Sequence, residues 1–178
     1  SAGYTHVASS ASLTSATSEP FDVIAPAPVE VRWINAAGGN WSVGSNWSTG
    51  TPPTPDQAVF IDEPGTYTVT LNVNATVNSL SLGAASGVQT LTTVSGRTLG
   101  FITSANVLGT GRLTLNGGTV NGGGPLAIAS GAVLTFILTS SVNAPVINAG
   151  TIAAGFNQFA AVAAVTGPLT TIARSHMR

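Results

Sequence analysis

Thr66-Tyr-Thr-Val-Thr-Leu71 opens a series of short segments in which polar and apolar residues alternate. The later members are Ser79-Leu-Ser-Leu82, Thr90-Leu-Thr-Thr-Val94, Arg112-Leu-Thr-Leu115, Leu126-Ala-Ile128, Val133-Leu-Thr-Phe136, Pro145-Val-Ile147 and Thr151-Ile152. A period of two residues is typical of β-strands with one face buried. The series therefore predicts an all-β domain whose strands are short and closely spaced.

The turns between these strands narrow the choice of architecture. Short strands separated by Asn116-Gly-Gly, Asn121-Gly-Gly-Gly124 and Asn148-Ala-Gly150 fit either a sandwich or a solenoid. No helical crossover interrupts the series, the Asn-Gly theme suits stacked corners, and residues 64–178 contain neither lysine nor a carboxylate side chain. These features favour a short parallel β-helix (β-solenoid) over residues 66–155, with about three strands and roughly 18 to 22 residues per coil.

The amino-acid sequence of the coils resembles that of a known group of proteins. Thr-Val-Asn-Ser-Leu-Ser-Leu-Gly, Gly-Arg-Leu-Thr-Leu-Asn-Gly-Gly and Ile-Asn-Ala-Gly-Thr-Ile resemble the repeats of autotransporter-like and haemagglutinin-like bacterial β-helix proteins. The resemblance covers about half of the chain. It implies a protein that is secreted or held at the bacterial surface.

The N-terminal segment has a different pattern. Alternation at residues 4–10 and 20–24 predicts two strands joined by a Ser/Ala/Thr-rich loop, and a proline-rich linker follows at residues 26–31. Residues 1–25 resemble the last two strands of a bacterial immunoglobulin-like repeat. We therefore expect a β-hairpin extension. Its candidate self-assembly residues are Tyr4, Val7, Phe21 and Val23.

Between the linker and the coils, residues 32–65 hold all three tryptophans, Trp33, Trp41 and Trp47. The segment resembles the entry sequence that precedes the coils in many bacterial surface β-helices. Its rings predict an aromatic cap over the open end of the solenoid, and the alternative is a carbohydrate-stacking platform. At the other end, residues 156–178 are apolar at first and predict a C-terminal cap.

Composition excludes several classes of function. The 178 residues include 5 basic and 6 acidic side chains, 6% charged in all, and no cysteine. A chain so poor in basic residues lacks the charge that binding to nucleic acid requires. No apolar run reaches the roughly 18 residues of a membrane helix, so we expect no membrane insertion. Low charge without cysteine favours an extracellular location at the bacterial cell surface.

We find no catalytic, cofactor or metal site in the sequence, and we expect a protein that is not an enzyme and needs no cofactor. β-Helix enzymes that cleave polysaccharides need carboxylates on the coils, and these coils have none. Asp62 and Glu63, with Asp56, are read as solvated turn charges rather than a calcium site. Ice binding would require a pair of threonines at the same point of every coil, and the sequence indicates that their position drifts from coil to coil.

The sequence as a whole predicts a non-enzymatic extracellular structural or adhesive module. We expect it to be a subunit of a surface fibre or filament that assembles head-to-tail through the N-terminal strands, so its main partner is a further copy of itself. A surface polysaccharide is the second candidate partner. The alternative hypothesis is a carbohydrate-binding module that uses the tryptophans.

Overall fold

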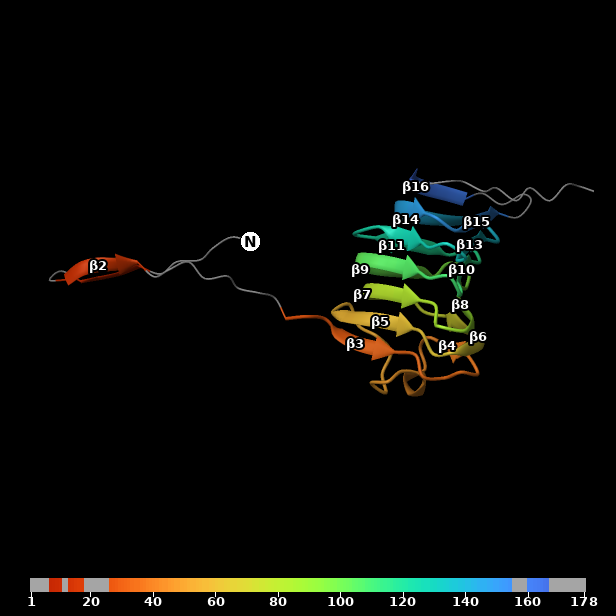
Figure 1. Ribbon diagram of the computed structural model, residues 1–178, viewed down its shortest axis with the longest axis horizontal. Coiled ribbons are helices and arrows are strands. Elements are labelled where there is room, and N and C mark those ends of the chain that lie inside the picture. Colours follow the sequence, from red (N-terminus) through yellow and green to blue (C-terminus); the bar gives the residue numbers. More distant parts are fainter. Residues whose placement is uncertain (1–6, 11–12, 18–25, 155–159, 167–178) are drawn as a thin grey trace, which may run out of the picture.

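The computed structural model describes residues 7–10, 13–17, 26–154 and 160–166. Within them, residues 29–154 and 160–166 form a parallel β-solenoid of roughly four turns, which confirms the predicted fold class. The chain alternates between two stacks of strands that face each other (Figure 1). Every strand pair in both stacks is parallel, because each coil returns the chain to its starting side before the next strand begins.

The strands of the solenoid divide between the two sheets. The six-stranded sheet contains β4 (Gly39–Asn40), β6 (Gly65–Leu71), β8 (Gly87–Thr93), β10 (Gly111–Leu115), β13 (Val133–Phe136) and β15 (Thr151–Ala154). The eight-stranded sheet contains β3 (Val29–Arg32), β5 (Gln57–Ile61), β7 (Ala75–Leu82), β9 (Thr98–Val107), β11 (Thr119–Gly122), β12 (Leu126–Ile128), β14 (Ser140–Asn148) and β16 (Ala160–Thr166).

The coils have the expected length but fewer strands than expected. Thr68 lies opposite Thr90, and Thr90 lies opposite Arg112, so these coils advance by 22 residues. Most coils contain two strands, one in each sheet, rather than three. Where Gly123, Gly124 and Pro125 interrupt the long strand, β11 and β12 share one level and both pair with β9 and β14.

The core is a set of inward-facing columns that run along the stack. On the six-stranded sheet, Val69, Leu91, Leu113 and Leu134 lie opposite one another in successive strands, and each is fully buried. Alternate residues face outward, because successive side chains of a strand point to opposite faces. This alternation is the period of two from which the strands were predicted.

The parallel pairing begins earlier than the expected boundary at residue 66. β3 pairs with β5, and β5 pairs with β7. The first coil therefore includes residues 29–31 of the expected linker and most of the expected entry segment, which begins at Arg32. Val31 pairs with Val59 and is completely buried, so these two strands belong to the common core.

At the other end, β16 pairs in parallel with β14 and continues the eight-stranded sheet. This strand falls within the segment 156–178 that was expected to cap the solenoid. The remaining residues of that segment lie outside the described part of the chain.

The N-terminal segment contains an antiparallel hairpin of β1 (Val7–Ser10) and β2 (Leu13–Thr17). The sequence predicts a loop where β2 lies, and that prediction is wrong. Leu13-Thr-Ser-Ala-Thr17 is rich in threonine, which favours strands, and a partner strand two residues away gives its backbone groups hydrogen-bonding partners. The predicted second strand, residues 20–24, lies outside the described residues.

Candidate functional site

The tryptophan cluster, defined as Trp33, Trp41 and Trp47, lies in the first coil. Trp47 makes edge contacts with both neighbours, with ring centroids 5.0 Å from Trp33 and 4.7 Å from Trp41. The ring of Tyr67, from β6, stacks on Trp33 at 6.5 Å. These aromatic contacts join segments that are far apart in the sequence.

The polar groups of the cluster are satisfied within the protein. The indole N–H of Trp47 donates to the carbonyl oxygen of Trp41 at 2.8 Å, and that of Trp33 donates to the carbonyl oxygen of Asn35 at 2.6 Å. Each of the three tryptophans is only 1% exposed. A sugar that stacks on a tryptophan needs an open ring face, and this structure offers none in the cluster.

Two asparagines hold the loops around the tryptophan cluster. Asn35 donates through Nδ2 to Oδ1 of Asn46 at 2.9 Å, and Asn46 donates through Nδ2 to the carbonyl oxygen of Asn40 at 3.1 Å. Asn46 lies in the short 3-10 helix η1 (Gly44–Asn46) and is buried. The side-chain amide of Asn46, the first residue of an Asn-Trp-Ser sequence, is therefore buried and already hydrogen-bonded to the neighbouring loop.

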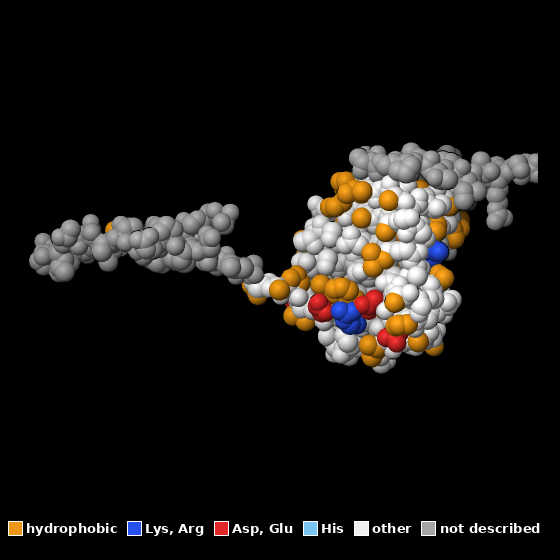
Figure 2. Space-filling view, in the orientation of Figure 1, with side chains coloured by type: hydrophobic (Ala, Val, Ile, Leu, Met, Phe, Trp, Pro, Cys, Tyr) orange, Lys and Arg blue, Asp and Glu red, His pale blue; other side chains and the backbone are white. Residues whose placement is uncertain are grey.

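The acidic residues that the structure describes, Glu30, Asp56, Asp62 and Glu63, lie at the same end of the solenoid as β3 and β5 (Figure 2). Asp62 follows β5 directly and pairs with Arg32, which also binds Glu30 at 3.0 Å. The guanidinium of Arg32 lies 4.4 Å from the centre of the Phe60 ring. The pairing with Asp62 and then Glu30 raises the pKa of Arg32.

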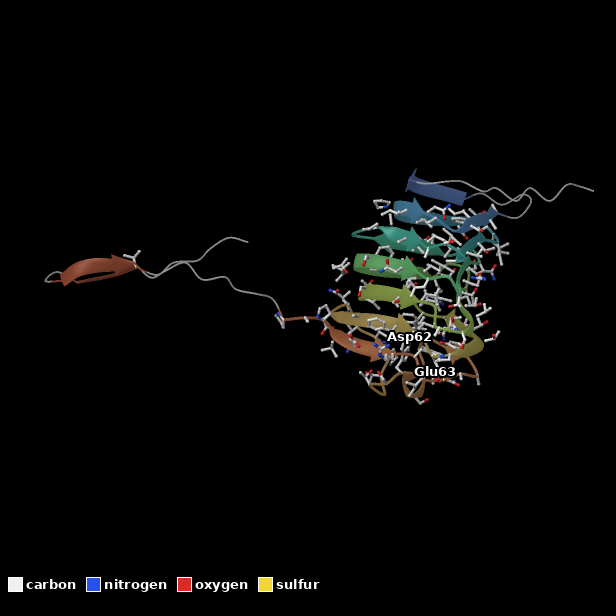
Figure 3. All side chains as sticks on the ribbon, viewed as in Figure 1. Asp62 and Glu63 are labelled. Atoms are coloured by element: carbon white, nitrogen blue, oxygen red, sulfur yellow. The ribbon has the colours of Figure 1, made fainter. Side chains whose placement is uncertain are left out.

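This arrangement leaves few free carboxylates to bind a metal ion. Asp62, which Figure 3 labels beside Glu63, is paired with Arg32. Asp56 accepts a hydrogen bond from the hydroxyl of Thr54, which lowers the pKa of Asp56. Among the described residues, no three His, Cys, Asp or Glu side chains come together as a metal site would require.

The candidate self-assembly residues are described only in part. Val7 lies in β1 and is 67% exposed. Tyr4, Phe21 and Val23 lie outside the described residues.

A shallow groove crosses the outer face of the eight-stranded sheet. Thr76, Gly100, Asn121 and Asn143 lie opposite one another in successive strands and line it. Asn143 donates through Nδ2 to Oδ1 of Asn121 at 2.9 Å, a two-step asparagine ladder. The ladder stabilises the stack, and we assign the groove no ligand.

One surface feature was missed in the sequence. On the outer face of the six-stranded sheet, Thr70 lies opposite Thr92, Thr92 opposite Thr114, and Thr114 opposite Thr135. The expectation that the threonines drift from coil to coil was wrong for this position. The sequence does contain the signal, because these four threonines follow one another at intervals of 22, 22 and 21 residues. The last interval is one residue shorter, so a search for one constant interval misses the alignment.

Among the described residues, no helical segment is long and apolar enough to cross a membrane. Comparisons with protein-family models, with curated proteins and with solved structures found no match.

Proposed function

We propose that this protein is a non-enzymatic structural module of the bacterial cell surface, a fibre subunit that assembles head-to-tail through its N-terminal strands. The proposal rests mainly on the hairpin β1–β2. Among the described residues, each of these strands pairs only with the other. A two-stranded hairpin is marginally stable in water unless it packs against a further surface.

The exposed side chain of Val7 supports assembly by strand addition. Val7 is 67% exposed in β1, so an apolar β-branched residue faces solvent on a strand with an open edge. Open edges of this kind add strands from other chains through main-chain hydrogen bonds. A contact between different surfaces of identical copies does not close on itself, and it generates a filament.

The solenoid supports the structural part of the proposal. Its buried columns continue through successive coils, so one core joins the strands along the stack. A close-packed interior is stiff, which suits a load-bearing rod. Residues 64–178 carry no carboxylate side chain, so the coils after the first lack the acid–base pair that a β-helix glycosidase would use. In the first coil, Glu30 and Asp62 are both paired with Arg32.

Deleting residues 1–25 tests the proposal. Light scattering should report polymers for the whole chain and single subunits for the deleted chain, with the same β-type circular dichroism for both. A point variant refines the test: Val7→Lys should weaken assembly, because a charged lysine on an open edge opposes strand addition.

Val43→Lys is the matched control, because Val43 is also an exposed valine, 42% exposed, but lies in a loop of the first coil. It should leave assembly unchanged. Polymers that survive the deletion, or a whole chain that stays monomeric at high concentration, would contradict the proposal.

A further inference from the structure

The six-stranded sheet carries an ordered array of threonines on its outer surface. One column contains Thr70, Thr92, Thr114 and Thr135, each opposite the next, and it is bounded by Asn40 on β4 and Ala153 on β15. A second column lies two residues earlier on the same strands, on the same side of the sheet. It contains Thr68, Thr90, Arg112, Val133 and Thr151. Together these two columns are called the threonine face.

The backbone beneath the threonine face is regular. The strand pairs β6–β8, β8–β10, β10–β13 and β13–β15 run without a register shift, whereas β7–β9 and β14–β16 each contain one. Adjacent strands are about 4.8 Å apart, and alternate residues of one strand are roughly 6.6 Å apart. The sheet therefore presents its hydroxyl and methyl groups on a repeating two-dimensional lattice.

The threonine side chains are also rigid. Threonine is branched at Cβ, so few rotamers are open to it. Between the two columns, the inward residues Val69, Leu91, Leu113 and Leu134 are all fully buried and hold the strands from the other side. The lattice is thus built before any ligand arrives.

The hydroxyls of the aligned column are free to bind an external partner. Those of Thr70, Thr92, Thr114 and Thr135 make no hydrogen bond with any residue that the structure describes. Threonines elsewhere differ: Thr110 donates to the carbonyl oxygen of Ala84 at 2.9 Å.

Arg112 interrupts the second column, but its charge is held at the edge of the face. One terminal nitrogen of its guanidinium donates to the carbonyl oxygens of Gly109, Gly111 and Gly131 at 2.8–3.2 Å. These carbonyls belong to the turns before the strands and to the first residue of β10. No other charged residue lies in the two columns. The threonine face therefore suits an uncharged ligand whose hydrogen-bonding groups repeat at a regular spacing.

We propose that the threonine face binds ice. The surface of an ice crystal is uncharged, repeats in two dimensions and consists of water oxygens that donate and accept hydrogen bonds. Rigid hydroxyl and methyl groups at regular spacing order water into such an array, whereas ordinary protein surfaces lack the periodicity. Ice binding would be independent of the proposed assembly, because it uses the outer face of the coils and not the N-terminal strands.

Freezing assays on the whole chain test the inference. We expect thermal hysteresis in an osmometer and small grains in an ice-recrystallisation assay. Thr92→Tyr and Thr114→Tyr, made separately, should each lose most of both activities, because a large ring projects from the middle of the lattice and keeps ice from the neighbouring threonines. Tyrosine suits strands, so the fold should persist, and circular dichroism checks this.

Thr76→Tyr is the matched control. Thr76 is an exposed threonine on β7, on the outer face of the other sheet. Its substitution should leave both activities intact. Folded wild-type protein that shows no hysteresis and lets grains grow as in buffer would overturn the inference. An equal loss in Thr76→Tyr and in the two face variants would also overturn it.

Discussion

Leu115→Asp is the sharpest test of the register of the solenoid. Leu115 lies in β10 between Thr93 and Phe136 of the adjacent strands, and it is completely buried. This burial was expected from the alternation in the sequence and is confirmed. Loss of a buried leucine side chain costs about 3 kcal/mol. An ionised carboxylate without a partner adds several kcal/mol more.

This total is a large fraction of the roughly 5–15 kcal/mol that stabilises a typical domain. The control variant lies one residue earlier. Thr114 faces outward on the same strand, so Thr114→Asp should change the free energy of unfolding by no more than about 0.5 kcal/mol.

The penalty in Leu115→Asp should also depend on pH. Burial raises the pKa of a carboxyl group above the value of about 3.9 that it has in an unfolded chain. The folded state therefore accepts the neutral form more readily. As pH falls toward 4, the electrostatic part of the penalty should disappear and the packing cost should remain.

Urea denaturation followed by circular dichroism at pH 7 and at lower pH measures these effects. If Leu115→Asp unfolded like the wild type while Thr114→Asp unfolded easily, the register would be wrong by one residue, because such a shift exchanges the two faces of a strand.

The other predictions concern Tyr67, two glycines in turns and the tryptophan cluster. Burial, with smaller effects of Glu63 and Asp62, raises the pKa of Tyr67 to about 12, so stability should fall as pH rises above about 10, where the unfolded chain ionises first. Tyr67→Phe should remove that alkaline loss in a pH series of thermal melts. At pH 7 it should change the melting temperature little, because the buried hydroxyl of Tyr67 has no hydrogen-bond partner of ordinary geometry among the described residues and only a weak one in the backbone of Glu63. Gly87→Ala should lower the melting temperature more than Gly96→Ala: both glycines have positive φ, but only at Gly87 would the new Cβ meet the Gly65 carbonyl oxygen, at 2.0 Å. The tryptophan cluster should emit blue-shifted fluorescence that soluble sugars do not change; red-shifted emission that responds to a sugar would contradict its burial.

The local pattern of polar and apolar residues was sufficient to predict the strands of the coils. Alternation of threonine or serine with leucine or valine identifies both the strand and its buried face, as at Val69 and Leu91. The absence of crossover helices then favours stacking of each strand on the equivalent strand of the next coil. These inferences need no long-range information, because the same physical rule repeats in every coil.

The parts that were missed depend on pairing with distant segments. Val29-Glu-Val-Arg32 follows two prolines and resembles a linker, and it becomes a strand because β5 lies beside it. The aligned threonine column depends on the register between strands of successive coils, and a coil of 21 residues after two of 22 hides it from a search for one constant interval. The partner of Asp62 was also hidden, since Arg32 lies 30 positions away and meets it only across two paired strands.

Electron microscopy of the whole chain, beside the chain that lacks residues 1–25, tests the proposed assembly most directly. We expect long unbranched fibres for the whole chain and separate particles for the shortened one. Separate particles in both samples, or fibres that persist without the N-terminal strands, would contradict it.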